Sequence, residues 1–240
     1  MPSHRKYRLR LARYAGITEA ITSFLDQHDS ALKLLEVGSG TGRSLAFYQV
    51  AGIADRLELW GIDTSQHRIK TIYEPSRWKL TLGDAQEGLP YEADFFDVCI
   101  CEQVLEHLKK PEKVIDEMVR VLRPGGMMVV GVPIFLPGIA NIRSVLVAFL
   151  DRFFGIKSSH IQTFTQRSIT TMVCEGQPLQ VKSHQGFRIV SGGILSWLED
   201  YKWWYLLNRR IGKTLPWLCT EVQIVLHKTN GSGIKPPSSK

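Results

Sequence analysis

The sequence predicts an α/β fold built on a doubly wound, mostly parallel sheet. Short apolar runs alternate with segments of helical pattern, as expected for strands joined by helical crossovers. Glycines at every second position, Gly38, Gly40 and Gly42, follow the first apolar run. Acidic residues stand at the ends of the first three runs, where an open sheet binds ligands.

The apolar runs before residue 134 have the length of buried strands. They cover residues 32–37, 57–62, 79–82, 97–101 and 127–132. Helical patterns occupy residues 41–50, a stretch from Ser65 and the segment that opens at Pro111. A proline suits a first helical turn, and Pro124-Gly125-Gly126 is predicted to end this helix.

Residues 124–142 carry no charge over a length that could span a bilayer. Their prolines and glycines interrupt any continuous helix, so we interpret them as a buried strand and a loop. Cys99 and Cys101 alternate along the fourth run and are predicted to be buried thiols on one side of a strand. No cysteine spacing indicates a disulfide or a metal site.

After residue 133 the alternation of strand and helix weakens. Thr165 is predicted to cap a helix that stops at Gly176, and residues 179–185 and 221–227 are predicted as strands six and seven. We therefore expect a basic arm at 1–14, one domain at 15–228 with inserts at 134–160 and 187–217, and a disordered tail at 229–240.

The net charge of +7 comes from the two ends of the chain. Five cations in residues 1–14 and two after Thr229 account for the whole excess of 30 basic over 23 acidic side chains. We interpret the arm as a solvated end, with attraction to phosphates or an anionic bilayer as the alternative. The first residues are too charged for a secretory signal, so the sequence predicts a cytoplasmic protein.

Glycines between a strand and a helix let a ligand approach the backbone closely. A plain turn and a dinucleotide site are alternatives, but a dinucleotide fingerprint is spaced G-x-G-x-x-G. Glu36 places a carboxylate just before the turn, where it would repel a pyrophosphate and attract a cationic ligand.

Asp63 ends the second run, 21 residues after Gly42, where a carboxylate can accept both hydrogens of a ribose diol. Asp84 follows the third run and can accept from an exocyclic amine such as that of adenine. Each acid alone is more often a turn or cap residue. Their recurrence at successive strand ends beside a glycine turn predicts a nucleoside site.

Four segments together resemble the class I S-adenosylmethionine-dependent methyltransferases, in the small-molecule branch that includes quinone-pathway enzymes. They are "LLEVGSGTG", "GIDTS", "GDAQEGLPYEADFFDVCICEQVLEHL" and "VLRPGGMMVVGVP", and they fall within residues 31–133. The resemblance implies a Rossmann-like, seven-stranded sheet whose last strand is antiparallel. It also implies S-adenosyl-L-methionine as the cofactor and a small-molecule acceptor.

The resemblance assigns cofactor-binding roles by position. Glu36, Gly38 and Gly40 would surround the methionine part, and Glu102 would lie near its amine. The remaining positions concern the nucleoside: Asp63 and Thr64 at the ribose, and Asp84 and the Ala85 amide at the adenine.

His107 is predicted to lie in the first helical turn after the fourth strand, near the methyl end of the pocket, where it could act as a base. A local capping or packing role is the alternative, and Glu106 is interpreted as a solvated or structural acid. Relatives that bind a divalent ion carry a glutamate where this chain has Gln103, so no metal is expected.

Residues 196–218 are rich in aromatics and cations, including Trp197, Trp203, Trp204 and Arg210. We expect a helix that packs its aromatics onto the sheet; a lid over an apolar acceptor or a peripheral membrane contact is the alternative. Residues 134–156 share that ambiguity.

Two other functions stay open at this point. The fourth run lacks the Asn/Asp-Pro-Pro-aromatic motif of amino-methylating nucleic-acid enzymes, so a nucleic-acid acceptor is disfavoured. A non-catalytic binding module on the same fold is the other alternative, and the oligomeric state is left open.

Overall fold

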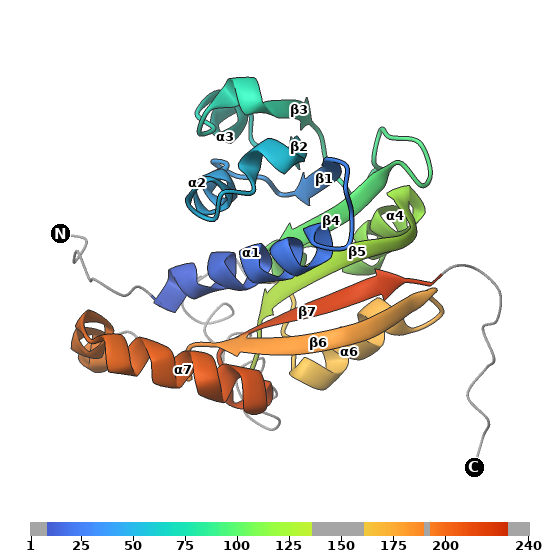
Figure 1. Cartoon of the computed structure of the whole chain (residues 1–240). Coiled ribbons are helices and arrows are strands. Elements are labelled where there is room, and N and C mark those ends of the chain that lie inside the picture. The colour runs from blue at the N-terminus through green and yellow to red at the C-terminus, as the bar shows by residue number, and fades with distance from the viewer. Residues whose placement is uncertain (1–8, 136–160, 190–192, 230–240) are drawn as a thin grey trace, which may run out of the picture.

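In the computed structural model, which describes residues 9–135, 161–189 and 193–229, the strands form one sheet in the order β3-β2-β1-β4-β5-β7-β6 (Figure 1). The strands are β1 (Leu32–Val37), β2 (Leu57–Asp63), β3 (Trp78–Leu82), β4 (Phe96–Glu102), β5 (Leu122–Pro133), β6 (Leu179–Phe187) and β7 (Glu221–Lys228). Strand β7 is antiparallel to both of its neighbours, and the other pairs are parallel. The predicted seven-stranded sheet with an antiparallel last strand is confirmed.

The helices connect these strands and flank the sheet. The α-helices are α1 (Ala12–Leu25), α2 (Arg43–Val50), α3 (Gln66–Lys70), α4 (Pro111–Val121), α6 (Gln166–Cys174) and α7 (Lys202–Thr214). Short 3₁₀ segments are η1 (Leu9–Leu11), η2 (Ala54–Arg56), η3 (Pro75–Arg77), η4 (Leu105–His107), η5 (Gly193–Asp200) and η6 (Pro216–Leu218). The Thr165 side chain caps α6 as predicted, and Ser65 caps α3 in the same way.

Helices cover both faces of the sheet. On one face, α1 and α2 pack on alternate residues of the central strands, with Ile21 and Tyr48 in the core. On the other face, α4 and α6 bury Met118 and Ile169 (Figure 1). Cys99 and Cys101 are buried in this second core as free thiols, which confirms the prediction.

Two predicted helix boundaries differ from the structure. Helix α4 ends at Val121, so Pro124 and the glycines after it lie inside β5 rather than at the helix end. Pro124 disfavours a helical conformation at the residue before it, which explains the earlier stop. Helix α2 begins at Arg43 rather than at Thr41, because Gly40 and Gly42 have φ angles of 58° and 64°.

The prediction that the aromatics of residues 196–218 pack onto the sheet is wrong for most of them. Helix α7 contacts β6 through its buried residues Asn208 and Gly212, where an added Cβ on Gly212 would overlap the Gly186 carbonyl. Trp197 and Trp203, by contrast, are about half exposed, at 50% and 56%. Close backbone approach at a glycine leaves no depth between helix and sheet for large side chains, so these face outward.

Several predictions concern residues outside the described ranges. They are the first eight residues of the basic arm, most of the insert at 134–160 and nearly all of the tail. The domain boundaries therefore stay predictions. Within the described part of the chain, no helix has both the length and the apolar character that a bilayer span requires.

Candidate active site

A cavity of about 400 Å³ opens at the carboxyl edge of the parallel strands, within the range typical of ligand pockets. It lies where the sheet order reverses between β1 and β4, the position at which open α/β sheets bind ligands. Its lining residues lie at or after the ends of β1 to β4: Val37, Gly38, Ile62, Asp63, Thr64, Arg68, Gly83, Asp84, Ala85, Gln103, Val104, His107 and Leu108.

Six of the nine predicted site residues line this cavity, and they come from four loops. They are Gly38, Asp63, Thr64, Asp84, Ala85 and His107. The structure thus brings together residues that are up to 69 positions apart in sequence, because parallel strands end at the same edge of the sheet.

The turn after β1 needs a glycine at position 38 because the Val104 side chain packs closely against it. Gly38 has a φ of 76°, and an added Cβ there would overlap the Val104 side chain from the loop after β4. A side chain at this position would therefore clash with the cavity wall and would strain the backbone.

Asp63 connects the glycine turn to the end of β2. Its Oδ2 accepts a hydrogen bond of 2.9 Å from the Gly40 backbone N–H, and its Oδ1 accepts one of 2.8 Å from Ser65 N–H. The residue is only 4% exposed, yet it reaches the cavity wall. Gly40 itself does not line the cavity but is one hydrogen bond away from it.

Asp84 is held by the turn that follows β3. Its carboxylate accepts hydrogen bonds from the backbone N–H of Gln86, at 2.9 Å, and from the Gln86 side-chain amide. Ala85 beside it is nearly buried in the cavity wall. An acid fixed by its own turn is ready to accept from a ligand amine on its free side.

Glu36 lies below the glycine turn and does not line the cavity. Its Oε1 accepts a hydrogen bond of 3.0 Å from the Tyr48 hydroxyl, and the residue is buried. Burial raises the pKa of Glu36 to about 7, although the hydrogen bond from Tyr48 acts in the opposite direction. The carboxylate is thus poised between its neutral and ionised forms near physiological pH.

Glu102 ends β4 and points away from the cavity, toward α1 and β7. Its Oε2 accepts a hydrogen bond of 2.7 Å from the Gln223 amide, and Arg13 Nε lies 3.9 Å from its Oε1. Gly131 leaves the space that this carboxylate fills. Burial raises the pKa of Glu102 to about 8, while Arg13 favours the ionised form.

His107 lines the cavity from η4, the single 3₁₀ turn after β4. Its side chain is 42% exposed, and its Nε2 lies 3.8 Å from Oε1 of Glu106. The sequence predicts either a solvated or a structural acid at Glu106. This residue is buried, so the expectation of a solvated acid is wrong. Its carbonyl accepts backbone hydrogen bonds from Ile161 and Gln162, which join this turn to the chain before α6.

Sequence reasoning did not assign Gln103 and Arg68 to the cavity wall, although both line it. Gln103 has a φ of 57°, and its buried side-chain Nε2 has no hydrogen-bond partner within the described residues. Strain and an unpaired donor at one residue are typical of a binding site. Arg68 Nη1 lies 3.8 Å from Asp63 Oδ2, and its place in the first turn of α3 could have indicated this proximity.

The cavity fits a nucleoside ligand. Asp63 and Asp84 offer carboxylate oxygens, Gln103 offers an unpaired N–H donor, and Val104 and Leu108 give an apolar wall. The described part of the chain holds no cluster of three His, Cys, Asp or Glu side chains suited to a metal ion. The expected absence of a metal stays a prediction.

Residues 35–130 match the family model described as a methyltransferase domain. This range contains every lining residue of the cavity, so the match and the geometry concern the same part of the chain.

Relatives with different acceptors are similar to part of this chain. The chain is 33% identical over 106 residues to a phosphatidylethanolamine N-methyltransferase of Cereibacter sphaeroides, covering 41% of this chain and 49% of the relative. It is 32% identical over 108 residues to the chloroplastic 2-methyl-6-phytyl-1,4-hydroquinone methyltransferase 2 of rice, Oryza sativa, covering 42% and 29%. A tRNA (carboxymethyluridine(34)-5-O)-methyltransferase of Arabidopsis thaliana is 31% identical over 115 residues, covering 47% and 26%. The aligned stretch spans less than half of the length of each relative.

Solved structures show the same fold at low sequence identity. The YcgJ protein of Bacillus subtilis has a TM-score of 0.58 at 14% identity, covering 90% of this chain and all of that one. The [4+2]-cyclase SpnF has a TM-score of 0.57 at 17% identity, covering 90% of this chain and 81% of that one.

Proposed function

We propose that the chain transfers the methyl group of S-adenosylmethionine to a small-molecule acceptor, and the match of residues 35–130 to a methyltransferase domain supports this proposal. One observation carries the proposal: Gly38, Asp63, Asp84 and His107 surround a single cavity at the point where the sheet order reverses. S-adenosylmethionine supplies an electrophilic methyl group on a positively charged sulfur.

The residues of the chain bind and position this cofactor. Asp63 is proposed to accept hydrogen bonds from the ribose hydroxyls, with Thr64 beside it. Asp84 is proposed to accept a hydrogen bond from the adenine amine, with Ala85 beside it. Gly38 lets the backbone approach the methionine part without a side chain between them. Holding both reactants in line supplies a large part of the rate acceleration in a displacement of this kind.

Glu36 and Glu102 are proposed to act by their charge rather than by direct contact. Neither lines the cavity, but Glu36 is buried and the side chain of Glu102 is only 11% exposed, and both lie at the ends of the central strands β1 and β4. A carboxylate in a medium of low polarity attracts a nearby cation more strongly than one in water. A ligand that carries sulfonium and ammonium groups would favour the ionised form of both acids, and their negative charge would then attract it.

His107 is proposed to take the proton from an O–H acceptor. It is the imidazole among the lining residues, and its side chain is accessible from solvent. General-base assistance of this kind contributes about 10²- to 10⁴-fold in rate. A carbon or amine acceptor would not depend on it to the same extent.

The acceptor class is proposed to be lipid-like or quinone-like. Two of the relatives named above act on a phospholipid and on a phytyl hydroquinone, by their names. Val104 and Leu108 provide apolar surface next to His107. Acceptors of this class reside in bilayers, so the proposal includes peripheral contact of the protein with a membrane surface.

The proposal is tested by calorimetry with S-adenosylmethionine, followed by transfer of labelled methyl groups to a lipid and quinone extract. The wild type should bind one equivalent, and Asp63→Ala should bind at least about tenfold more weakly because each charged hydrogen bond is worth about 1.5–3 kcal/mol. Asp29→Ala, which removes an exposed acid after α1, is the matched control. Unchanged affinity in Asp63→Ala would overturn the site assignment.

A nucleic-acid acceptor is a second candidate, supported by the similarity to the Arabidopsis tRNA enzyme and by the basic arm. It predicts tight RNA binding whose affinity falls steeply with salt, because each neutralised phosphate releases counterions. Methyl transfer to RNA but not to the lipid extract would select this candidate.

A non-catalytic role is the third candidate, because a fold alone does not determine a reaction. The likeness to a [4+2]-cyclase illustrates this point. Stoichiometric cofactor binding without transfer to either extract would support it.

A further inference from the structure

We propose that the outer face of η5 and α7 is a docking surface for a bilayer that contains anionic lipids. The outer face is defined by Trp197, Tyr201, Lys202, Trp203, Leu206, Leu207 and Arg210. This inference deepens the proposed function by naming the surface through which a membrane-held acceptor would be reached.

Exposed apolar side chains are concentrated on this part of the molecule. Eleven large hydrophobic residues are exposed in the described part of the chain, and seven of them come from residues 197–217. Scattered surface hydrophobics need no explanation, but a local concentration indicates a binding surface.

The helical geometry collects these residues on one side. Trp203, Leu206, Leu207 and Arg210 follow the i, i+3, i+4, i+7 spacing, so they form one stripe along α7. The buried residues of α7, Asn208 and Gly212, lie on the opposite side against β6. The stripe therefore faces away from the body of the protein.

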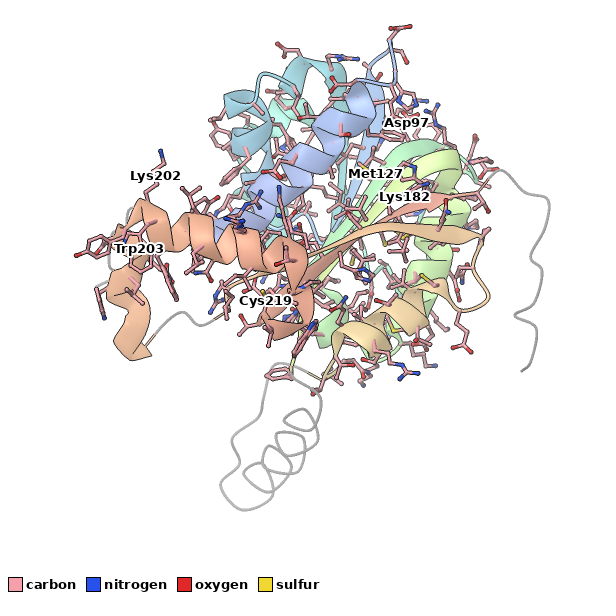
Figure 2. All side chains as sticks on the ribbon, turned by 60° about the horizontal axis from the view of Figure 1, so that its bottom comes forward. Asp97, Met127, Lys182, Lys202, Trp203 and Cys219 are labelled. Carbon is pink, nitrogen blue, oxygen red and sulfur yellow. The ribbon has the colours of Figure 1, made fainter. Side chains whose placement is uncertain are left out.

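Aromatic side chains extend the stripe past the start of the helix. The rings of Trp197 and Tyr201 lie 6.0 Å apart in an edge-on arrangement, and those of Tyr201 and Trp203 lie 6.5 Å apart. Figure 2 shows Lys202 and Trp203 at the end of α7 that is farthest from the sheet. Tryptophan and tyrosine combined with basic residues are typical of the membrane–water interface.

The charge of this region is complementary to an anionic surface. From Tyr201 to Thr220 the chain contains Lys202, Arg209, Arg210 and Lys213 and no acid. Arg209 and Lys213 pair with Glu19 of α1, whereas the side chains of Lys202 and Arg210 are exposed. The exposed cations can therefore contact lipid headgroups.

The basic arm is attached beside this surface. Arg209 Nη1 donates a hydrogen bond of 3.3 Å to the Ala12 carbonyl, so α1 begins next to α7. The residues before Ala12 in sequence include four cations, Arg5, Lys6, Arg8 and Arg10.

The charge disfavours a second copy of the chain as the occupant. A two-fold interface through the outer face would bring the same patch of both copies together, and with it Lys202 and Arg210 of each. Like charges held close in a desolvated interface are unfavourable. An anionic bilayer offers an apolar region to the aromatic side chains and negative charge to the basic side chains.

The surface is also on the side of the molecule where the cavity opens. Strand β6 is parallel to β5, so its end at Phe187 lies at the carboxyl edge of the sheet. Asn208 of α7 accepts a hydrogen bond of 2.9 Å from Ile189 N–H just beyond that end. The first half of α7 thus lies at the same edge as the cavity (Figure 1).

The test is sedimentation of the full chain with vesicles. The wild type should bind vesicles of phosphatidylcholine with phosphatidylglycerol and should bind phosphatidylcholine alone much more weakly. The double variant Trp203→Ser/Leu206→Ser and the charge variant Lys202→Glu/Arg210→Glu should each lose at least about tenfold in affinity, since each basic residue near the surface contributes about fivefold.

Val50→Ser and Lys113→Glu are the matched controls, since they change an exposed hydrophobic residue on α2 and an exposed cation on α4. Both should bind vesicles like the wild type. Cofactor affinity by calorimetry should be unchanged in all four variants, which separates this proposal from the proposed function.

Two results would overturn the inference. The first is a failure of the vesicle test, in which either the wild type does not bind the anionic vesicles or the outer-face variants bind them as tightly as the wild type does. The other is a dimer in analytical ultracentrifugation that Trp203→Ser/Leu206→Ser dissociates while vesicle binding is absent, which would assign the surface to self-association.

Discussion

The backbone N–H of Gly40 donates a hydrogen bond of 2.9 Å to Oδ2 of Asp63, and this bond joins the glycine turn after β1 to the acid that ends β2. Because Asp63 also accepts from Ser65 N–H, one carboxylate fixes two neighbouring loops of the cavity. A change at Asp63 should therefore affect both the shape and the charge of the site.

Asp63→Asn should destabilise the protein by about 1–2 kcal/mol, since one of the two backbone donors would face the amide NH₂ group instead of an oxygen. Denaturant unfolding monitored by circular dichroism measures this change. The exposed variant Asp29→Asn should unfold at the same denaturant concentration as the wild type. A fully stable Asp63→Asn would mean that the hydrogen bond to Gly40 contributes nothing to the fold.

Gly38→Ala should abolish cofactor binding and lower stability by about 3 kcal/mol, through left-handed backbone strain and overlap with Val104. Gly52→Ala is the matched control, because Gly52 has a φ of 71° but no atom within 4 Å of an added Cβ. Gly52→Ala should lower stability only through left-handed backbone strain, by about 1–2 kcal/mol. Equal losses in the two variants would contradict a packing role for Gly38.

His107→Gln should lower kcat for an O–H acceptor by about 10²- to 10⁴-fold and leave cofactor affinity unchanged. Single-turnover transfer of labelled methyl groups measures the chemical step, and calorimetry measures binding. Glu112→Gln, an exposed change at the start of α4, serves as the control for handling and purity. Equal rates for His107→Gln and the wild type would leave His107 with a local packing role only.

Stability without ligand should fall as the pH rises from about 4.5 to about 7. The pKa of Glu36 is about 7 in the folded protein and near its ordinary value of 4.5 in the unfolded chain, so the folded state holds the proton more tightly. The contribution is full below the unfolded pKa and is lost as the pH passes the folded pKa, by up to about 3 kcal/mol. Glu102, with a pKa of about 8, extends the decline.

Glu36→Gln should flatten this pH dependence, because the amide does not titrate. Denaturant unfolding at a series of pH values compares it with the wild type and with Glu112→Gln, whose profile should follow the wild type. A Glu36→Gln profile that is as steep as the wild-type profile would show that Glu36 is ionised throughout. Saturating cofactor should also reduce the slope, since a cationic ligand favours the ionised carboxylate.

The sequence predicted most of the fold because its signals are local. The run at residues 32–37 coincides with β1, and the Thr165 cap begins α6, because strand length and capping depend on neighbouring residues. Asp63 and Asp84 could be assigned to one site because parallel strands end at one edge of the sheet.

What the sequence alone determined was therefore the order of the strands and helices, the glycine turn and the acids at the strand ends. The tertiary structure decided which acids reach the cavity: Glu36 turns to Tyr48, and Glu102 turns to Gln223, 121 residues away. It also decided that Trp203 faces outward, because Gly212 brings α7 close against β6. Such outcomes depend on contacts between distant segments, and no local pattern encodes the partner that a buried charge or an amphipathic helix will find.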